Sequence, residues 1–259
     1  MIKPNLMPSR QEKLQTLLAL SHELGSPARP LAILAEGNTS AKLSTETFFV
    51  KASGSNLGLL KKTDVVECRM EILLALLNRK NPADAEIENG LLASRVDNAA
   101  KKPSVEALFH AYLLSLPGIE FVGHTHAPNA NSILCSPRAK EFATKRIFPD
   151  EIVCCDVASV FIPYTDPGLR LAQVMREQTE KFLKQFGRPP RVILMENHGV
   201  ITLGRSIGAV LSAMLMAEKA AGIWLGAAAL DGPKFMSPKH VARISGRPDE
   251  ALRRNILKL

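Results

Sequence analysis

An α/β fold in a single domain, followed by a basic extension, is the architecture that the sequence predicts. Short apolar runs alternate irregularly with longer segments that carry helical periodicity. The 259 residues are enough to bury one large core. The composition, 46% hydrophobic and 22% charged, is that of an ordinary globular protein and excludes a disordered chain, a collagen and a disulfide-knotted mini-protein. We place the domain in residues 1–231 and the extension in residues 232–259.

The N-terminal half begins with a helix and continues with short strands. Leu14, Leu17 and Leu18 share one face of a helix over residues 11–24, which Gly25 ends. We then expect polar turns at residues 35–40 and 53–56, strands at 48–52, 65–68 and 119–126, helices at 70–77 and 104–116, and a loop at 78–102 with a short helix near Leu91.

The C-terminal half repeats the alternation. We expect a helix at residues 129–134, strands at 151–155 and 160–163, an amphipathic helix at 169–186, strands at 191–195 and 200–203, and a long helix at 206–230. A tight polar turn, residues 196–199, joins the last two strands. Neither half contains an internal repeat, so one α/β unit accounts for the whole domain.

The positive charge is concentrated in the extension. The chain carries 33 basic and 25 acidic residues, a net charge of +8, and residues 232–259 hold +5 of it. A nucleic-acid surface would need aromatic side chains for stacking, whereas this chain has one Trp and two Tyr and no nucleic-acid-binding motif. We therefore predict no nucleic-acid partner, and the mild basicity fits attraction of an anionic small substrate.

The cysteines and the apolar segments predict a cytoplasmic protein without a membrane span. No C-x-x-C pair occurs among the four cysteines, which favours reduced thiols. Residues 1–10 lack the apolar core of a signal peptide. Residues 207–230 imitate a span in composition, but Glu218 and Lys219 lie at their middle, where charge is costly in lipid, so we expect a long buried helix there.

Three histidines are placed as metal ligands would be. His124 and His126 are two residues apart at the end of an apolar strand, so both imidazoles point to the same side of the sheet. His198 lies in a turn beside Gly199, which permits close backbone approach. Three imidazoles that leave one position open are typical of a catalytic zinc site rather than a structural one.

An oxygen ligand or general base is expected from the helix that precedes this strand. Glu106 begins that helix and can fold back near the strand end. His110 lies one turn further on the same helix face, so the two side chains could act as a pair of ligands. We favour the alternative in which His110 only packs or forms hydrogen bonds on the helix face.

Six short motifs follow one another along the chain. They are Glu36-Gly37-Asn38-Thr39-Ser40, Lys51-Ala52-Ser53-Gly54, Pro103-Ser104-Val105-Glu106, Gly123-His124-Thr125-His126, Pro163-Tyr164-x-x-Pro167-Gly168 and Asn197-His198-Gly199. In this order, over about residues 10–230, the chain resembles the class II aldolase/adducin family, which includes fuculose-phosphate aldolase, rhamnulose-phosphate aldolase and ribulose-phosphate 4-epimerase. The opening, residues 33–57, most resembles the aldolase halves of rhamnose-pathway aldolase–dehydrogenase fusions.

The resemblance implies a three-layer αβα sandwich around a central, mostly antiparallel sheet. It also implies a divalent cation, most often Zn²⁺, held by His124, His126 and His198, with Glu106 as the catalytic glutamate. By the same resemblance, the substrate's phosphate would bind at Gly37, Asn38, Ser53, Gly54 and Ser104. Backbone N–H groups in glycine turns and small hydroxyls suit an anion, although ordinary turn chemistry also explains these residues.

Two departures from the family pattern bear on the substrate and on the catalytic acid. Many members that use phosphorylated substrates have two small hydroxyl residues before the glutamate, whereas this chain has Ser104 and then Val105. The catalytic tyrosine that fuculose-phosphate aldolase has after the H-x-H segment has no counterpart here, and Tyr164 belongs to another motif. The phosphorylation of the substrate and the identity of the acid therefore stay open.

The resemblance favours a metal-dependent aldolase that cleaves a small ketose or ketose phosphate through a metal-stabilised enediolate. One alternative within the family is an epimerase, decarboxylase or dehydratase acting on a sugar acid or sugar phosphate, because the enediolate is common to these reactions. Another is a non-catalytic, adducin-like binding module, which the retained histidines and glutamate disfavour. Family members are usually homotetramers, so we expect a homotetramer. We expect a solvated extension; the alternatives are a lid over an anionic substrate and a segment that covers a neighbouring subunit.

Overall fold

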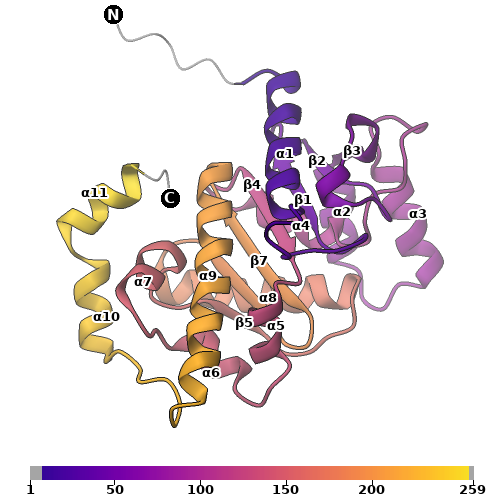
Figure 1. Ribbon diagram of the computed structural model, residues 1–259. Helices are drawn as coiled ribbons and strands as arrows, with labels where there is room; N and C mark the ends of the chain where they lie inside the picture. Colours follow the sequence, from indigo (N-terminus) through magenta and orange to yellow (C-terminus); the bar gives the residue numbers. More distant parts are fainter. Residues whose placement is uncertain (1–7, 257–259) are drawn as a thin grey trace, which may run out of the picture.

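The computed structural model describes residues 8–256, and within them seven strands form one mixed sheet (Figure 1). The strands are β1 (Asn38–Lys42), β2 (Thr47–Lys51), β3 (Val65–Arg69), β4 (Phe121–Thr125), β5 (Val160–Ile162), β6 (Val192–Met195) and β7 (Gly199–Gly204). Their order across the sheet is β3-β2-β1-β4-β7-β6-β5. Only β5 and β6 pair in parallel, so the prediction of a mostly antiparallel sheet is confirmed.

Helices cover both faces of this sheet and make three layers. The helices are α1 (Arg10–Leu24), α2 (Met70–Leu77), α3 (Asp84–Ser94), α4 (Ala107–Ser115), α5 (Pro128–Leu134), α6 (Ala139–Thr144), α7 (Pro149–Cys155), α8 (Leu169–Phe186), α9 (Ile207–Ala228), α10 (Pro238–Ser245) and α11 (Pro248–Ile256). One apolar core lies between the sheet and α2, α4 and α8. The other lies under α1, α5 and α9, and Figure 1 shows α1 and α9 in front of the strands. The αβα sandwich is therefore confirmed.

Most predicted elements are found within one to three residues of their expected ends, and α8 has the predicted bounds. The strand expected at residues 151–155 is wrong, because this segment is the helix α7. Pro149 occupies its first turn, where a missing N–H costs nothing, and Asp150 and Glu151 lie at the positive end of the helix. The expected turn at residues 35–40 gives way to β1 from Asn38, whereas the helix expected near Leu91 within the loop at 78–102 is found as α3 and is eleven residues long.

The basic extension folds back onto the domain. α10 and α11 pack against α7, and Arg253 of α11 forms an ion pair with Asp150 at 2.5 Å. The backbone N–H of Met236 donates to the carbonyl of Arg146 at 2.9 Å. The extension therefore packs on the domain while staying largely solvated, since neither helix contributes a fully buried residue. Residues 1–7, part of the segment in which we expect no signal peptide, and residues 257–259, the end of the extension, lie outside the described residues.

The long helix α9 forms where it was predicted but is only partly buried: one face packs on the fold, whereas Ile223 (44%) and Leu225 (36%) are exposed. It packs against β7, α5 and α7, and its Trp224 contacts Phe142 of α6 and Phe235 of the segment before α10, with ring centroids 5.6 and 5.1 Å apart. α9 also has the length and hydropathy of a membrane span, a test that the core helix of a soluble protein passes too. All four cysteines are free thiols, and three of them are buried.

We expect the apolar core on the α2 face to carry much of the stability. Leu73 of α2 is fully buried there, whereas Leu59 is 74% exposed. Leu73→Ala should lower the free energy of unfolding by about 2–5 kcal/mol, because it leaves a cavity, and Leu59→Ala should change it by less than about 0.5 kcal/mol. Urea unfolding monitored by circular dichroism checks both values. A small effect of Leu73→Ala would contradict the packing described for this face.

Candidate metal centre

Two imidazoles meet at the end of the central strand β4. His124 is fully buried, and His126 is the first residue after the strand. Their Nε2 atoms are 3.2 Å apart. His124 Nδ1 lies 3.1 Å from the carbonyl oxygen of Val200 on β7, so this nitrogen is the donor and Nε2 keeps its lone pair toward the cluster. The pairing of β4 with β7 thus sets both the orientation and the tautomer of His124.

The third imidazole comes from the turn between β6 and β7. Asn197 takes φ +52°, a conformation that asparagine tolerates better than most residues, and presents His198 toward β4. Asn131 of α5 donates from its side-chain nitrogen to the carbonyl of His198 at 3.0 Å. The rings of His124, His126 and His198 have centroids 5.0–5.3 Å apart, and their nearest ligand nitrogens all lie within 4.8 Å of one another. Two chain segments therefore bring the ligand nitrogens of three imidazoles together.

A carboxylate joins the imidazoles from the opposite side. Glu106 directly precedes α4 and is 8% exposed. Its Oε1 lies 3.3 Å from His198 Nε2 and its Oε2 lies 3.6 Å from His124 Nε2. The sequence predicts this convergence from the position of Glu106 at the start of the helix; whether Glu106 is catalytic stays a prediction.

A buried hydrogen-bond chain fixes this carboxylate. Asn38 of β1 donates from Nδ2 to Glu106 Oε2 at 2.5 Å, and its Oδ1 accepts from His110 Nε2. His110 Nδ1 in turn accepts from Ser40 Oγ at 2.6 Å. The orientation of the Asn38 amide is consistent only if neutral His110 carries its proton on Nε2. His110 therefore forms hydrogen bonds on the helix face, the alternative that we favoured over a second ligand.

The protonation states suit cation binding. Burial lowers the pKa of His124 to about 4 although the Glu106 carboxylate opposes the shift, and burial likewise lowers the pKa of His126. Burial lowers the pKa of His110 to about 3. Burial alone would raise the pKa of Glu106, but the facing His124 and His198 rings and the hydrogen bond from Asn38 hold it below its ordinary value. At neutral pH the site therefore offers His124 and His126 in the unprotonated form and Glu106 as an ionised carboxylate, the forms that bind metals.

His126, His198 and Glu106 line a cavity of about 220 Å³, and the five residues predicted to bind phosphate line it too. They are Gly37, Asn38, Ser53, Gly54 and Ser104. Gly37 has φ +63°, and a Cβ there would lie 2.4 Å from the carbonyl oxygen of His124, so only glycine lets this turn approach β4. The Asn38 side chain already forms hydrogen bonds with Glu106 and His110. The phosphate-binding role of all five residues stays a prediction.

Two further charged residues belong to this cavity and were given no role by the sequence argument. Lys51, at the end of β2, is 2% exposed and donates from Nζ to the carbonyls of Ala35 (3.2 Å) and Ser55 (2.6 Å). Burial lowers its pKa to about 8, against the charges of Glu106 and Asp64. Glu36 places Oε1 3.7 Å from His126 Nδ1. The signal that could have identified Lys51 as a functional residue is a lysine inside an apolar strand.

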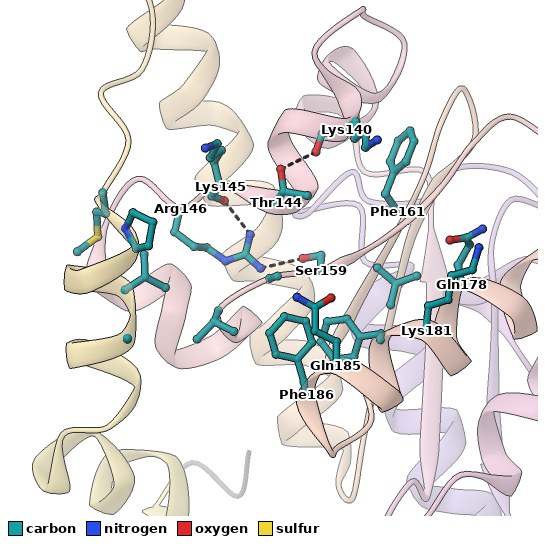
Figure 2. Close-up of a pocket in the computed structure, with 18 of the residues that line it drawn as sticks. Lys140, Thr144, Lys145, Arg146, Ser159, Phe161, Gln178, Lys181, Gln185 and Phe186 are labelled. Carbon is teal, nitrogen blue, oxygen red and sulfur yellow. Dashed lines mark hydrogen bonds between the residues drawn. The ribbon is translucent and has the colours of Figure 1, made fainter.

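Neither cavity size nor a tyrosine identifies this site. A larger cavity, of about 900 Å³, lies between α6, β5, α8 and α10 and shares no lining residue with the imidazole cluster (Figure 2). Among residues 8–256 no tyrosine lines the imidazole cavity, and Tyr164 is 58% exposed, with its hydroxyl 3.0 Å from Asp166. The site is identified instead by its potential metal ligands, the imidazole nitrogens and the carboxylate beside them.

The residues present fit a divalent cation. Three imidazoles place their ligand nitrogens within 4.8 Å of one another, the far nitrogen of one ring donates to a backbone carbonyl, and a carboxylate lies beside them. This donor set is that of zinc sites with an open position, and it also suits other first-row divalent cations.

Comparison with known proteins gives the same family along most of the chain. The family model described as Class II Aldolase and Adducin N-terminal domain matches residues 15–225. A Bacillus subtilis protein described as the uncharacterized oxidoreductase YuxG is 28% identical over 178 residues, which cover 66% of this chain and 23% of that protein. This chain therefore spans about a quarter of the length of that curated relative.

Solved structures show the same fold. The N-terminal class II aldolase domain of a conserved protein from Thermoplasma acidophilum is 24% identical, covers 87% of this chain and 99% of its own, and gives a TM-score of 0.66. Escherichia coli YgbL, a putative aldolase/epimerase/decarboxylase, is 17% identical with coverages of 90% and 97% and a TM-score of 0.67. An L-fuculose 1-phosphate aldolase is 16% identical with coverages of 92% and 96% and a TM-score of 0.67.

Gly199 should be required for the imidazole arrangement. A Cβ at this position would lie 2.5 Å from the carbonyl oxygen of Thr125 and 3.0 Å from ring atoms of His124 and His126. Gly199→Ala should therefore lower the free energy of unfolding by about 1–3 kcal/mol. Gly226→Ala in α9, where no atom lies within 4 Å of the added Cβ, should be neutral or stabilise by up to about 1 kcal/mol. Equal unfolding midpoints for the two variants in urea would contradict the close approach.

Proposed function

The chain belongs to the class II aldolase and adducin family, and on this premise we propose that it is a metal-dependent aldolase that cleaves a small ketose or ketose phosphate. The convergence of His124, His126 and His198 beside Glu106 carries the proposal. The three imidazoles would hold the cation, for which we propose Zn²⁺. When bound, such a cation acts as a Lewis acid that stabilises negative charge on the ketose oxygens as the carbon–carbon bond breaks.

Glu106 is the residue that would move the proton. Its ionised carboxylate borders the cavity, and Asn38 holds one of its oxygens, so the other can reach a substrate carbon. In the cleavage direction, the substrate hydroxyl that becomes the aldehyde would lose its proton, the Glu106 carboxylate would take up a proton from solvent, and its conjugate acid would deliver that proton to the carbon that loses its partner. In the reverse direction, the carboxylate would remove that proton. The buried chain of Ser40, His110 and Asn38 restricts the carboxylate to this position.

The charge of the cavity supports an anionic substrate. The ammonium of Lys51 is buried in its wall and remains largely protonated at pH 7. Beside it lie the glycine turns at Gly37 and Gly54 and the hydroxyls of Ser53 and Ser104. Together these groups would bind the phosphate of a ketose phosphate, the kind of substrate that the name of the L-fuculose 1-phosphate aldolase with a similar fold states.

A second candidate function uses the same site but forms a different product. The name of E. coli YgbL includes epimerase and decarboxylase activities, and the fold of the present chain is similar to that of YgbL. Epimerisation, decarboxylation or dehydration of a sugar acid or phosphate would use the same cation and the same Glu106. Product analysis by NMR on a panel of ketoses, ketose phosphates and sugar acids separates the candidates, because only aldol cleavage yields two carbon fragments of aldehyde and ketone.

The proposal includes an assembly and a location. We propose a homotetramer in the cytoplasm, consistent with an aldolase family fold and with four free cysteines. Since no tyrosine of the described chain lines the cavity, a neighbouring subunit could supply the missing acid at the aldehyde oxygen. Light scattering of the purified protein measures the oligomeric state.

Loss of one imidazole should remove the cation. His126→Ala should reduce bound divalent metal, measured by mass spectrometry of the purified protein, from about one ion per chain to background and should abolish turnover. His240→Ala, on the exposed α10, is the matched control and should retain both. A wild-type protein that binds no divalent cation, and that zinc, manganese and cobalt fail to activate across the ketose panel, would overturn the proposal.

Glu106→Gln should separate metal binding from proton transfer. The amide keeps the size of the side chain but cannot take up a proton, so bound metal should remain largely unchanged. Solvent deuterium exchange at the donor carbon of the ketone product should fall by about 10²–10⁴-fold, as NMR in D₂O would measure. Glu177→Gln, an exposed change on α8, controls for the loss of one charge. Undiminished exchange in Glu106→Gln would assign the proton transfer to another residue.

A further inference from the structure

A second polar cavity, of about 290 Å³, lies where the C-terminal extension meets the domain. Ile152 and Asp156 line it from α7 and its end, Arg188 and Arg191 from the segment between α8 and β6, and Ser245 and Arg254 from the extension. It shares no lining residue with the imidazole cavity. Whatever binds here is therefore separate from the proposed reaction.

The wall of this cavity carries an excess of positive charge. Three guanidinium groups face one carboxylate, Asp156, which gives a net charge of +2. Both carboxylate oxygens of Asp156 already accept hydrogen bonds from Arg188, at 2.7 and 2.8 Å. The remaining charge belongs to Arg191 and Arg254.

Both of these arginines keep unused donors. Arg191 donates from Nη1 to the carbonyl of Val153 at 2.5 Å, and Arg254 donates from Nη2 to the carbonyl of Ser245 at 3.0 Å. Within residues 8–256 these are their hydrogen bonds, and neither guanidinium has a carboxylate within 4 Å. A guanidinium has five N–H donors, so most of them remain for a ligand.

The acidic side chains nearby are bound to other cations. Asp150 lies 2.5 Å from Arg253, Glu250 lies 3.7 Å from the same guanidinium, and Glu151 lies 3.7 Å from Arg146. Burial lowers the pKa of Arg191, the charge of Asp156 opposes this shift, and Arg254 adds to it. The like charges of Arg191 and Arg254 thus repel each other across a partly buried space.

We propose that this cavity is a binding site for a small phosphate-type dianion. A dianion would balance the excess charge of +2, and planar guanidinium groups match the oxygens of phosphate with paired N–H donors. The volume lies at the lower limit of small-molecule sites, which fits inorganic phosphate or a phosphoryl group on a small metabolite.

Binding would fasten the extension to the domain. Arg254 and Ser245 belong to the extension, whereas Asp156, Arg188 and Arg191 belong to the domain. A dianion held by Arg191 and Arg254 replaces their repulsion with two attractive contacts across this junction. The docking of α10 and α11 on α7 would then depend on the concentration of the anion.

Hydrogen–deuterium exchange of the full chain, titrated with inorganic phosphate against chloride at constant ionic strength, tests the proposal. Phosphate should slow amide exchange in residues 238–256 several-fold, with half-maximal effect at a defined concentration. Arg191→Gln and Arg254→Gln should each raise that concentration at least tenfold. Arg243→Gln, an exposed arginine of α10 outside the cavity, should leave it unchanged.

Peptides from residues 35–54 and 104–106 report separately on phosphate in the imidazole cavity, so the two sites are distinguished in one experiment. Equal protection by chloride, or an unchanged phosphate response in both Arg191→Gln and Arg254→Gln, would overturn the proposal. If Arg191→Gln fails to fold, Arg254→Gln alone decides, because its side chain lies near the chain end and is only partly buried.

Discussion

Burial of an ionisable carboxylate among imidazoles is the constraint around which the centre of this protein is built. Glu106 is 8% exposed and His124 is fully buried, so each polar atom must find a partner inside the protein. Asn38 satisfies one oxygen of Glu106 and is itself held by His110. These partners come from β1, α4 and β4, and the antiparallel pairing of β1 with β4 sets Asn38 directly opposite His124. The register of the sheet therefore determines the geometry of the site.

Much of the fold followed from the sequence because its signals were local. α8 combines an amphipathic pattern with Gly187 at φ +67°, and both of its ends were predicted. The apolar run at residues 152–155 has no periodicity that separates a strand from a buried helix, so the helix-starting role of Pro149 was the better guide. β1 was hidden because its residues are small and polar, and they gain strand structure from β2 and β4 on either side.

The candidate site was predictable in part, for a similar reason. The spacing of His124 and His126 within one strand predicted that they lie together. The order of the family motifs added Glu106 and His198 to the predicted site. The hydrogen bonds of Asn38 and the position of Lys51 depend on contacts between segments distant in the sequence. Lys51 Nζ on β2, for example, donates to the carbonyl of Ala35, which lies before β1. Such tertiary contacts leave no periodic pattern in the sequence, so the family resemblance assigned Asn38 to an anion and Lys51 received no role.

The single tryptophan has a practical consequence for following the extension. Trp224 lies between Phe142 of the domain and Phe235, which leads into α10, and the guanidinium of Arg138 lies 4.9 Å from its ring. Since no other indole occurs in the chain, its emission comes from this junction alone. Detachment of the segment at Phe235 exposes one face of the indole to water and shifts the fluorescence to longer wavelength, which provides a built-in optical probe in the unlabelled protein.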